Sequence, residues 1–196
     1  MADNFQIKDA AAANQTVRTV DIGSNTHIPL AASDALPLTS ATLTRPADVV
    51  PYASGDAMTN STTVPVALTF ANIANRNGGS FAIFTAHLVS SNQAGTGPFI
   101  LDLYNGASAP TATNDNAAYN PSDADRNNCI GTIIFPAANV NAGSSNKVII
   151  GATPPIIMSR CDASTTSIFG LLKAGAAYTP ISAETFKIFL AGVRDN

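Results

Sequence analysis

Residues 98–136 read PFILDLYNGASAPTATNDNAAYNPSDADRNNCIGTIIFP, and this stretch decides how the rest of the chain is interpreted. Its two ends, residues 99–104 and 130–135, are apolar runs. The first run alternates with a period of two and the second is rich in β-branched residues, so both predict strands. The polar insert between them has no helical period, and loops of such length in compact domains are usually functional or partly disordered. The sequence therefore predicts a β-rich domain whose distinctive polar residues lie on a loop between two core strands.

The composition is short of charge without being unusually apolar. Charged residues make up 12% of the 196-residue chain, hydrophobic residues 45%, and the mean hydropathy is +0.15. An average globular protein is about 25% charged, so neutral Ser, Thr, Asn and Gln must supply much of this surface. A surface with few charges does little to resist association, which favours an assembled state over a free monomer.

The charge balance and the hydropathy pattern exclude two classes of partner. A net charge of −3 and a pI near 5.1 argue against a nucleic-acid-binding protein, which needs a basic face. No apolar run approaches the roughly 20 residues of a membrane-spanning helix. The first residues, MADNFQIKDAAAANQ, show no basic region followed by an apolar one, so no secretion signal is predicted.

The pattern along the chain predicts an all-β fold, a β-sandwich or jelly roll with an extended N-terminal arm. Residues 1–26 are predicted to be the arm, since they hold too few large apolar residues to fold alone, and residues 27–196 the β-sandwich domain. The arm either adds to the sheet or pairs with the sheet edge of a neighbouring subunit. Besides the two central runs, strands are predicted at residues 16–22, 27–30, 41–44, 64–70, 81–89, 148–150, 156–159, 167–172 and 185–193.

Three of these strands carry further expectations. Pro65 marks residues 64–70 as an edge strand or a strand start. Both faces of residues 81–89 are largely apolar, which predicts a strand covered on both sides. Residues 167–178 also show the spacing of a helix face, but Gly170 and Gly175 would each weaken a helix by about 1 kcal/mol, so a strand is preferred.

The sequence contains no recognisable catalytic motif, and no catalytic residue is assigned. His27 and His87 are the only histidines, and both are interpreted as structural because each lies in an apolar run. The sequence has no GxSxG, HExxH or phosphate-loop pattern. Cys129 and Cys161 are predicted to be reduced, buried thiols, with a single disulfide between them as the alternative. The chain is therefore not expected to be an enzyme.

The best metal candidate is DADRN at residues 123–127, with Asp115 upstream. It matches the first three ligand positions of a calcium loop. The match then fails, because Asn128 stands where that loop needs glycine and Ile134 where it needs glutamate. Carboxylates on a polar loop more often bond to nearby backbone N–H groups. We therefore interpret these residues as turn formers and predict neither a metal nor another cofactor.

Several motifs, taken in this order, resemble a family of tailed-bacteriophage virion proteins known as phage structural proteins. The motifs are RPAD at residues 45–48, YASGD at 52–56, FILDLY at 99–104, DNAAY at 115–119, AD at 124–125 and IG at 130–131. The opening KDAAAANQTVRTVDIGSNTHIPL is also similar to the N-terminal arms of phage virion proteins. The similarity covers most of residues 7–136, and it assigns no functional residue, since the family has no catalytic set to match.

The resemblance implies a structural role in the phage particle. The first expectation is a capsid decoration (cement) protein, made in the host cytoplasm, that binds the outer surface of the virion capsid and stabilises it. Its partners would be the major capsid protein and further copies of itself as a dimer or trimer, without nucleic acid or membrane. A tail, baseplate or fibre component is the alternative, and a carbohydrate-binding module is a second one. The chain has no Trp, and its nine Phe lie mostly in predicted strands, which argues against a sugar-binding platform.

Overall fold

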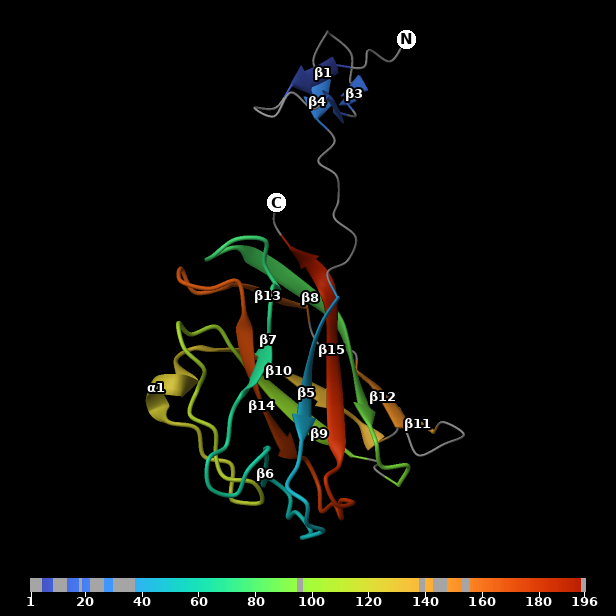
Figure 1. Ribbon diagram of the computed structural model, residues 1–196, viewed down its shortest axis with the longest axis vertical. Helices are drawn as coiled ribbons and strands as arrows, with labels where there is room; N and C mark the ends of the chain where they lie inside the picture. Colours follow the sequence, from blue (N-terminus) through green and yellow to red (C-terminus); the bar gives the residue numbers. More distant parts are fainter. Residues whose placement is uncertain are drawn as a thin grey trace. The chain divides into compact units, whose positions relative to one another are not determined.

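The computed structural model describes residues 5–8, 14–17, 19–21, 27–29, 38–94, 97–137, 140–142, 148–152 and 156–194. The chain divides into two compact units, Met1–Ala35 and Leu36–Asn196. In the second unit two antiparallel sheets pack together, which confirms the predicted all-β sandwich (Figure 1). None of the described segments forms a helix with the length and hydropathy needed to cross a membrane.

The first sheet has the strand order β11-β12-β8-β15-β5, and β13 also pairs with β8. At its centre lie the two longest strands, β8 (Ser80–Ser90) and β15 (Thr185–Arg194), as predicted from their apolar runs. One edge is β5 (Leu38–Thr44). The remaining strands are β11 (Val140–Ala142), β12 (Val148–Ala152) and β13 (Ile157–Arg160).

The second sheet has the strand order β10-β9-β14-β6. β7 also pairs directly with β14, at residues 168–170, whereas β6 pairs with it at residues 172–173. Both runs around the insert form strands as predicted, β9 (Phe99–Tyr104) and β10 (Cys129–Phe135), and the two pair antiparallel. The expectation of two core strands is wrong for β10, which lies at the edge of the sheet with only Ile133 and Phe135 buried. The predicted strand at 167–172 is also confirmed, as β14 (Ile168–Ala174). The two short strands are β6 (Ala57–Met58) and β7 (Leu68–Phe70).

In the N-terminal unit the structure describes four short strands. β1 (Phe5–Lys8) pairs with β2 (Asn14–Val17), and β3 (Thr19–Asp21) pairs with β4 (His27–Pro29). The strands predicted at residues 16–22 and 27–30 overlap these elements. The predicted boundary between arm and sandwich, after residue 26, lies outside the described residues and stays a prediction.

The core lies between the two sheets because alternate residues of their strands point inward. Phe99, Leu101 and Leu103 of β9 are fully buried, as their period of two predicts. The ring of Phe99 meets that of Phe186 from β15 edge-to-face, with centroids 5.2 Å apart. Fully burying one such side chain contributes about 1.5–3 kcal/mol, so these inward rows supply much of the stability.

Two strand predictions were wrong in detail. The strand predicted at residues 64–70 is reduced to β7, and Val64 and Val66 are exposed. The side chains of Asn60 and Ser61 accept hydrogen bonds from the backbone N–H groups of Val66 and Val64, which favours a turn. The strand at 81–89 is not covered on both sides, because Phe84 is 41% exposed.

In the second unit three elements were not predicted. β6 is two residues long and β11 three, so neither gives a clear period in the sequence. The third is α1 (Asp123–Arg126), a single helical turn that begins after Ser122. The Ser122 hydroxyl accepts a hydrogen bond from the backbone N–H of Asp125, the usual role of serine at a helix start.

Candidate interaction surface

The insert between β9 and β10 is anchored to the outer side of the second sheet. The Tyr119 hydroxyl lies 2.7 Å from the Tyr104 hydroxyl of β9. The Lys173 ammonium of β14 lies 4.5 Å from the centre of the Tyr119 ring, and it also pairs with Asp102 at 3.1 Å. The long polar loop is therefore held in place by β9, which precedes it in sequence, and by β14, which comes later in the chain.

The insert also contributes to a buried ion pair at one end of the sandwich. The Arg45 Nη2 donates to Asp115 Oδ2 at 3.1 Å, and the two side chains are 0% and 1% exposed. The other carboxylate oxygen, Oδ1, accepts from the Tyr52 hydroxyl at 2.7 Å and from the Thr59 backbone N–H at 2.8 Å. A second carboxylate, Asp48, lies 3.2 Å from Arg45 and is partly exposed. We call Arg45, Asp48, Tyr52, Thr59 and Asp115 the Arg45 network.

A second buried polar group lies next to the Arg45 network. Glu184 is fully buried and accepts from the Tyr178 hydroxyl at 2.5–2.6 Å and from Ser90 and Asn92. Backbone bonds join the two groups, because the Arg45 N–H donates to the Glu184 carbonyl at 2.9 Å and the Tyr52 N–H to the Tyr178 carbonyl at 2.9 Å. Four chain segments that are distant in sequence therefore meet at this end of the sandwich.

Three of the six motifs quoted above meet in the Arg45 network. Arg45 and Asp48 belong to RPAD, Tyr52 to YASGD and Asp115 to DNAAY. Backbone bonds join the last two motifs: the Ala57 N–H donates to the Ala117 carbonyl and the Tyr119 N–H to the Gly55 carbonyl. From the sequence alone, Asp115 is only a candidate metal ligand or turn former and Arg45 has no predicted role, since the two residues lie 70 positions apart and local patterns cannot pair them.

All four tyrosines have a pKa raised above the ordinary value of about 10. Burial is the main cause in each case. The hydrogen bond to Asp115 further raises the pKa of Tyr52, and the one to Glu184 that of Tyr178. These phenols therefore stay protonated in the folded protein at pH values where an unfolded chain would ionise them.

We expect the free energy of unfolding to fall as the pH rises above about 10. Below that pH the phenols are protonated in both states, and above it only the unfolded chain releases their protons. In an alkaline titration, tyrosinate absorbance should appear together with loss of the β-sheet circular dichroism signal. Absorbance that rises near pH 10 while the fold remains intact would contradict the burial of these hydroxyls.

The calcium candidate does not assemble. Residues 123–126 form α1, and the Asp125 carboxylate accepts from the Ser122 hydroxyl at 2.7 Å and from the Thr111 N–H at 3.2 Å. Asp115 is bound in the Arg45 network instead. Among the described residues no group of three or more His, Cys, Asp or Glu is placed to hold a metal ion.

Neither His87 nor either cysteine belongs to the Arg45 network. The side chain of His27 lies outside the described part of the structure. His87 stacks on Phe189 with ring centroids 4.4 Å apart, and its pKa is lowered by burial. Cys161 is buried as predicted, whereas Cys129 is exposed, because it is the first residue of β10. No disulfide joins the two cysteines, so the alternative of a Cys129–Cys161 bond is wrong.

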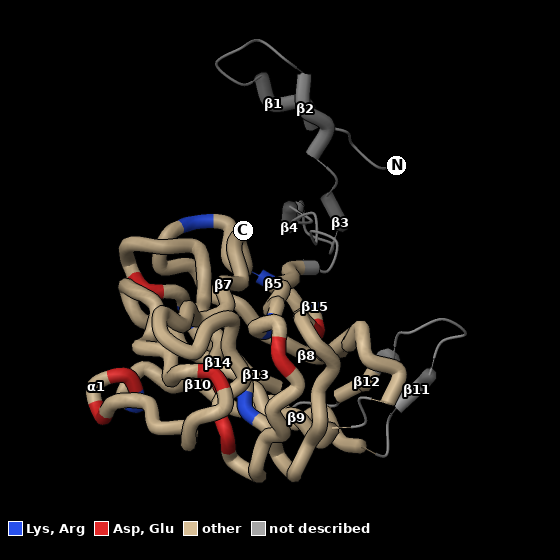
Figure 2. Tube along the Cα trace, turned by 60° about the horizontal axis from the view of Figure 1, so that its bottom comes forward, with Lys and Arg blue, Asp and Glu red and all other residues tan. Residues whose placement is uncertain are grey.

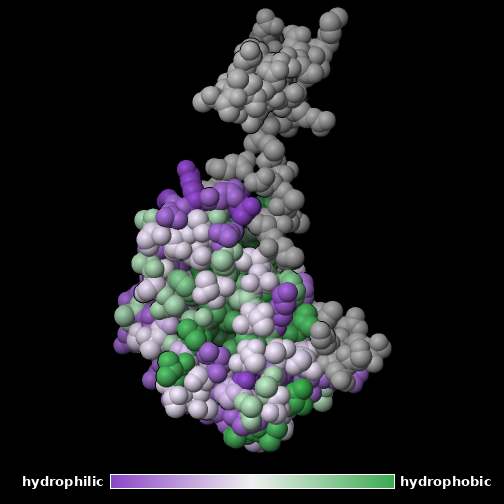
Figure 3. Space-filling view, in the orientation of Figure 1, coloured by the Kyte–Doolittle hydropathy of each residue, from purple (hydrophilic) through white to green (hydrophobic). Residues whose placement is uncertain are grey.

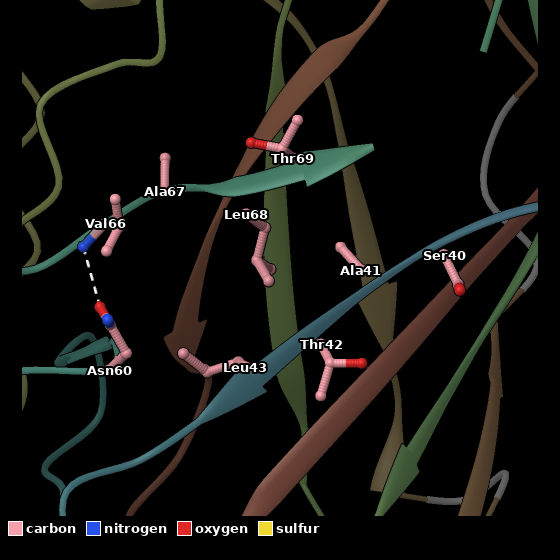
Figure 4. A pocket seen from close by; sticks show the side chains of 9 residues that line it. All are labelled: Ser40, Ala41, Thr42, Leu43, Asn60, Val66, Ala67, Leu68 and Thr69. Carbon is pink, nitrogen blue, oxygen red and sulfur yellow. Dashed lines mark hydrogen bonds between the residues drawn. The ribbon is translucent and has the colours of Figure 1, made fainter. Parts of the chain in front are cut away.

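A groove of about 390 Å³ runs between the edge strands of the two sheets (Figure 4). One wall is formed by β5 and the other by β7 and the residues before it. The Thr39 hydroxyl donates to the Ala71 carbonyl at 2.8 Å and ties the two walls together. None of the lining residues is charged; they are Ser40, Ala41, Thr42, Leu43, Asn60, Val66, Ala67, Leu68 and Thr69.

The rest of the sandwich surface is also sparsely charged. Charged residues are few and scattered along the described trace (Figure 2). Residues of intermediate hydropathy cover much of the face seen in Figure 3, with apolar residues among them. Several large apolar side chains are more than half exposed, namely Val49, Val64, Val66, Ile134, Ile156 and Met158.

Comparison with models of known protein families and with curated proteins finds no match.

Proposed function

We propose that this protein is a virion structural protein that binds the outside of a tailed-phage capsid and stabilises it. The observation that carries the proposal is the uncharged groove between β5 and β7, set in a surface with few charges. Neutral hydrogen-bonding groups and modest apolar patches make weak contacts individually. On a capsid, many identical copies of such contacts act together, so tight binding at each one is not required.

The resemblance of the motifs to phage structural proteins supports the proposal. Three of these motifs also have a structural role in this chain. RPAD, YASGD and DNAAY supply the Arg45 network, which fixes the insert to the sandwich. The partners proposed are the major capsid protein and further copies of the chain. No catalytic step is proposed.

Copy number in the particle tests the proposal. In purified virions, a quantitative gel should give a number of copies comparable to that of the major capsid protein, and antibody labelling should cover the head. A few copies per particle, with labelling at the tail, would reject capsid decoration in favour of a tail, baseplate or fibre component. Absence from the virion would reject both roles.

A glycan array tests the carbohydrate-binding alternative, and we expect no binding. Sugar platforms need exposed aromatic rings, and Phe84 is the only large aromatic residue recorded as exposed in the described segments. The chain has no Trp, and Tyr52, Tyr104 and Tyr178 are buried. Specific binding of one glycan class that Phe84→Ala abolishes would overturn this expectation.

A further inference from the structure

One edge of the first sheet is open. β5 pairs with β15 along one side, and no strand in the described segments pairs along its other side. The β5–β7 groove follows this open side. The unpaired backbone groups of an edge strand are a ready template for a strand from another chain.

The register shows which backbone groups of β5 face the groove. Thr44 lies opposite Thr185, so Arg45 lies opposite Glu184, and the Arg45 N–H donates to the Glu184 carbonyl at 2.9 Å. Residues of an antiparallel pair alternate between bonded and non-bonded positions. It follows that the backbone groups of Ser40, Thr42 and Thr44 point away from β15.

The far side of β15 agrees with this register. The Thr185 carbonyl accepts a hydrogen bond from the Ser91 N–H at 3.0 Å, so Thr185 is bonded on the β8 side and not to Thr44. The side chains of Ser40, Thr42 and Thr44 are exposed, whereas those of Thr39, Ala41 and Leu43 are buried. A strand added to this edge would therefore place its own small polar side chains on the solvent face.

β5 lacks the features that usually prevent pairing between sheet edges. Proteins protect such edges with charged side chains, proline or bulges. The sequence of β5 is LTSATLT, with neither charge nor proline, and its register with β15 runs without a shift. The opposite wall of the groove is also uncharged.

We propose that β5 pairs antiparallel with β5 of a second copy across a two-fold axis at Thr42, which joins the two sheets into one. In such a contact only the residue on the axis meets its own symmetry mate, so a charge at position 42 would face an identical charge. The uncharged β5 and groove walls meet this requirement. Ser40 would lie opposite Thr44, and these hydroxyl residues are favourable cross-strand neighbours. This contact rests on the proposed function, which names further copies of the chain as a partner, and it specifies the surface and the symmetry of that association.

Paired charge variants test the axis directly, using the full-length protein without phage particles. Analytical ultracentrifugation should show a dimer for the unmodified chain. Thr42→Lys and Thr42→Glu should each raise the dimer dissociation constant at least about tenfold, because like charges meet at the axis. An equimolar mixture of the two variants should restore the dimer. Thr111→Lys is the matched control, since it makes the same substitution at an exposed residue of the insert, outside the groove, and should leave the dimer intact.

Each other outcome would overturn the inference. A monomeric unmodified chain would show that the edge stays unpaired, and a closed trimer is incompatible with a two-fold contact. Dissociation by Thr42→Lys without rescue in the mixture would indicate another occupant of the groove, such as the N-terminal segment of a second copy. Circular dichroism of each variant verifies folding. Because no capsid is present, failure here would leave the copy-number test of the proposed function unaffected.

Discussion

Replacing Asp115 by asparagine is expected to destabilise the sandwich by about 3 kcal/mol, because Arg45 then keeps a buried charge without its main partner. Both side chains are almost fully buried, so solvent screens the pair little. Asp48, which is partly exposed, remains beside Arg45, so we expect the low end of the range for broken buried pairs. For a chain of this size the loss corresponds to a fall in Tm of about 6–12 °C, measurable by thermal or urea unfolding.

Two further variants make this expectation specific. Asp123→Asn removes an exposed carboxylate from the same insert and should change stability by no more than about 0.5 kcal/mol. The double variant Arg45→Met with Asp115→Asn should be more stable than Asp115→Asn alone, since the unpaired charge is gone. A double variant less stable than Asp115→Asn would contradict a coupled pair.

Gly192→Ala should have the largest effect of any single methyl addition, and we expect it to cost about 4 kcal/mol or more. The residue lies at an irregularity of β15, between Ala191 and Gly192, opposite β8. An added Cβ would lie 1.8 Å from the Ala82 carbonyl oxygen and 2.9 Å from the Ile83 Cα. These are backbone atoms at the centre of the sheet, so no side-chain movement relieves the overlap.

Gly151→Ala is the matched control for this substitution. Gly151 lies in β12 of the same sheet, where an added Cβ meets no atom within 4 Å. Its replacement should be neutral or slightly stabilising, within about 1 kcal/mol. Soluble expression and thermal unfolding of both variants provide the comparison. Equal stability of Gly192→Ala and the unmodified chain would mean that β15 does not approach β8 as described.

Strands with a strict period of two could be predicted from the sequence. Where helix and strand patterns compete, the sequence does not show the packing that decides between them. β9 follows from the alternation of Phe99, Leu101 and Leu103. At 167–178 helix and strand patterns competed, and packing explains the outcome. An added Cβ at Gly170 would lie 2.9 Å from atoms of both Leu101 and Phe70, so a larger residue does not fit between these side chains. Propensity alone cannot supply that information.

For the candidate surface, the sequence predicts which kinds of residue it contains but not which strands form it. The low charge and the neutral polar residues were evident, and they indicated assembly. Which strand forms the open edge depends on the order of strands in the sheet, which no local pattern reveals. The alternation at Val64 and Val66 was misleading, because Asn60 and Ser61 bind the backbone there and leave both valines exposed beside the groove.

The Arg45 network has a consequence for how the molecule opens. A long polar loop such as the insert before α1 can detach locally while the rest of a domain stays folded. Releasing the insert, however, would remove Asp115 from Arg45 and from the Tyr52 hydroxyl, which donates to it. Tyr52 is in turn bonded through its backbone to Tyr178. The anchored part of the insert thus belongs to the same cooperative unit as both sheets. The amide protons of Asn116 and Tyr119, which bond to the Ala57 and Gly55 carbonyls, should exchange with solvent only when the whole domain unfolds.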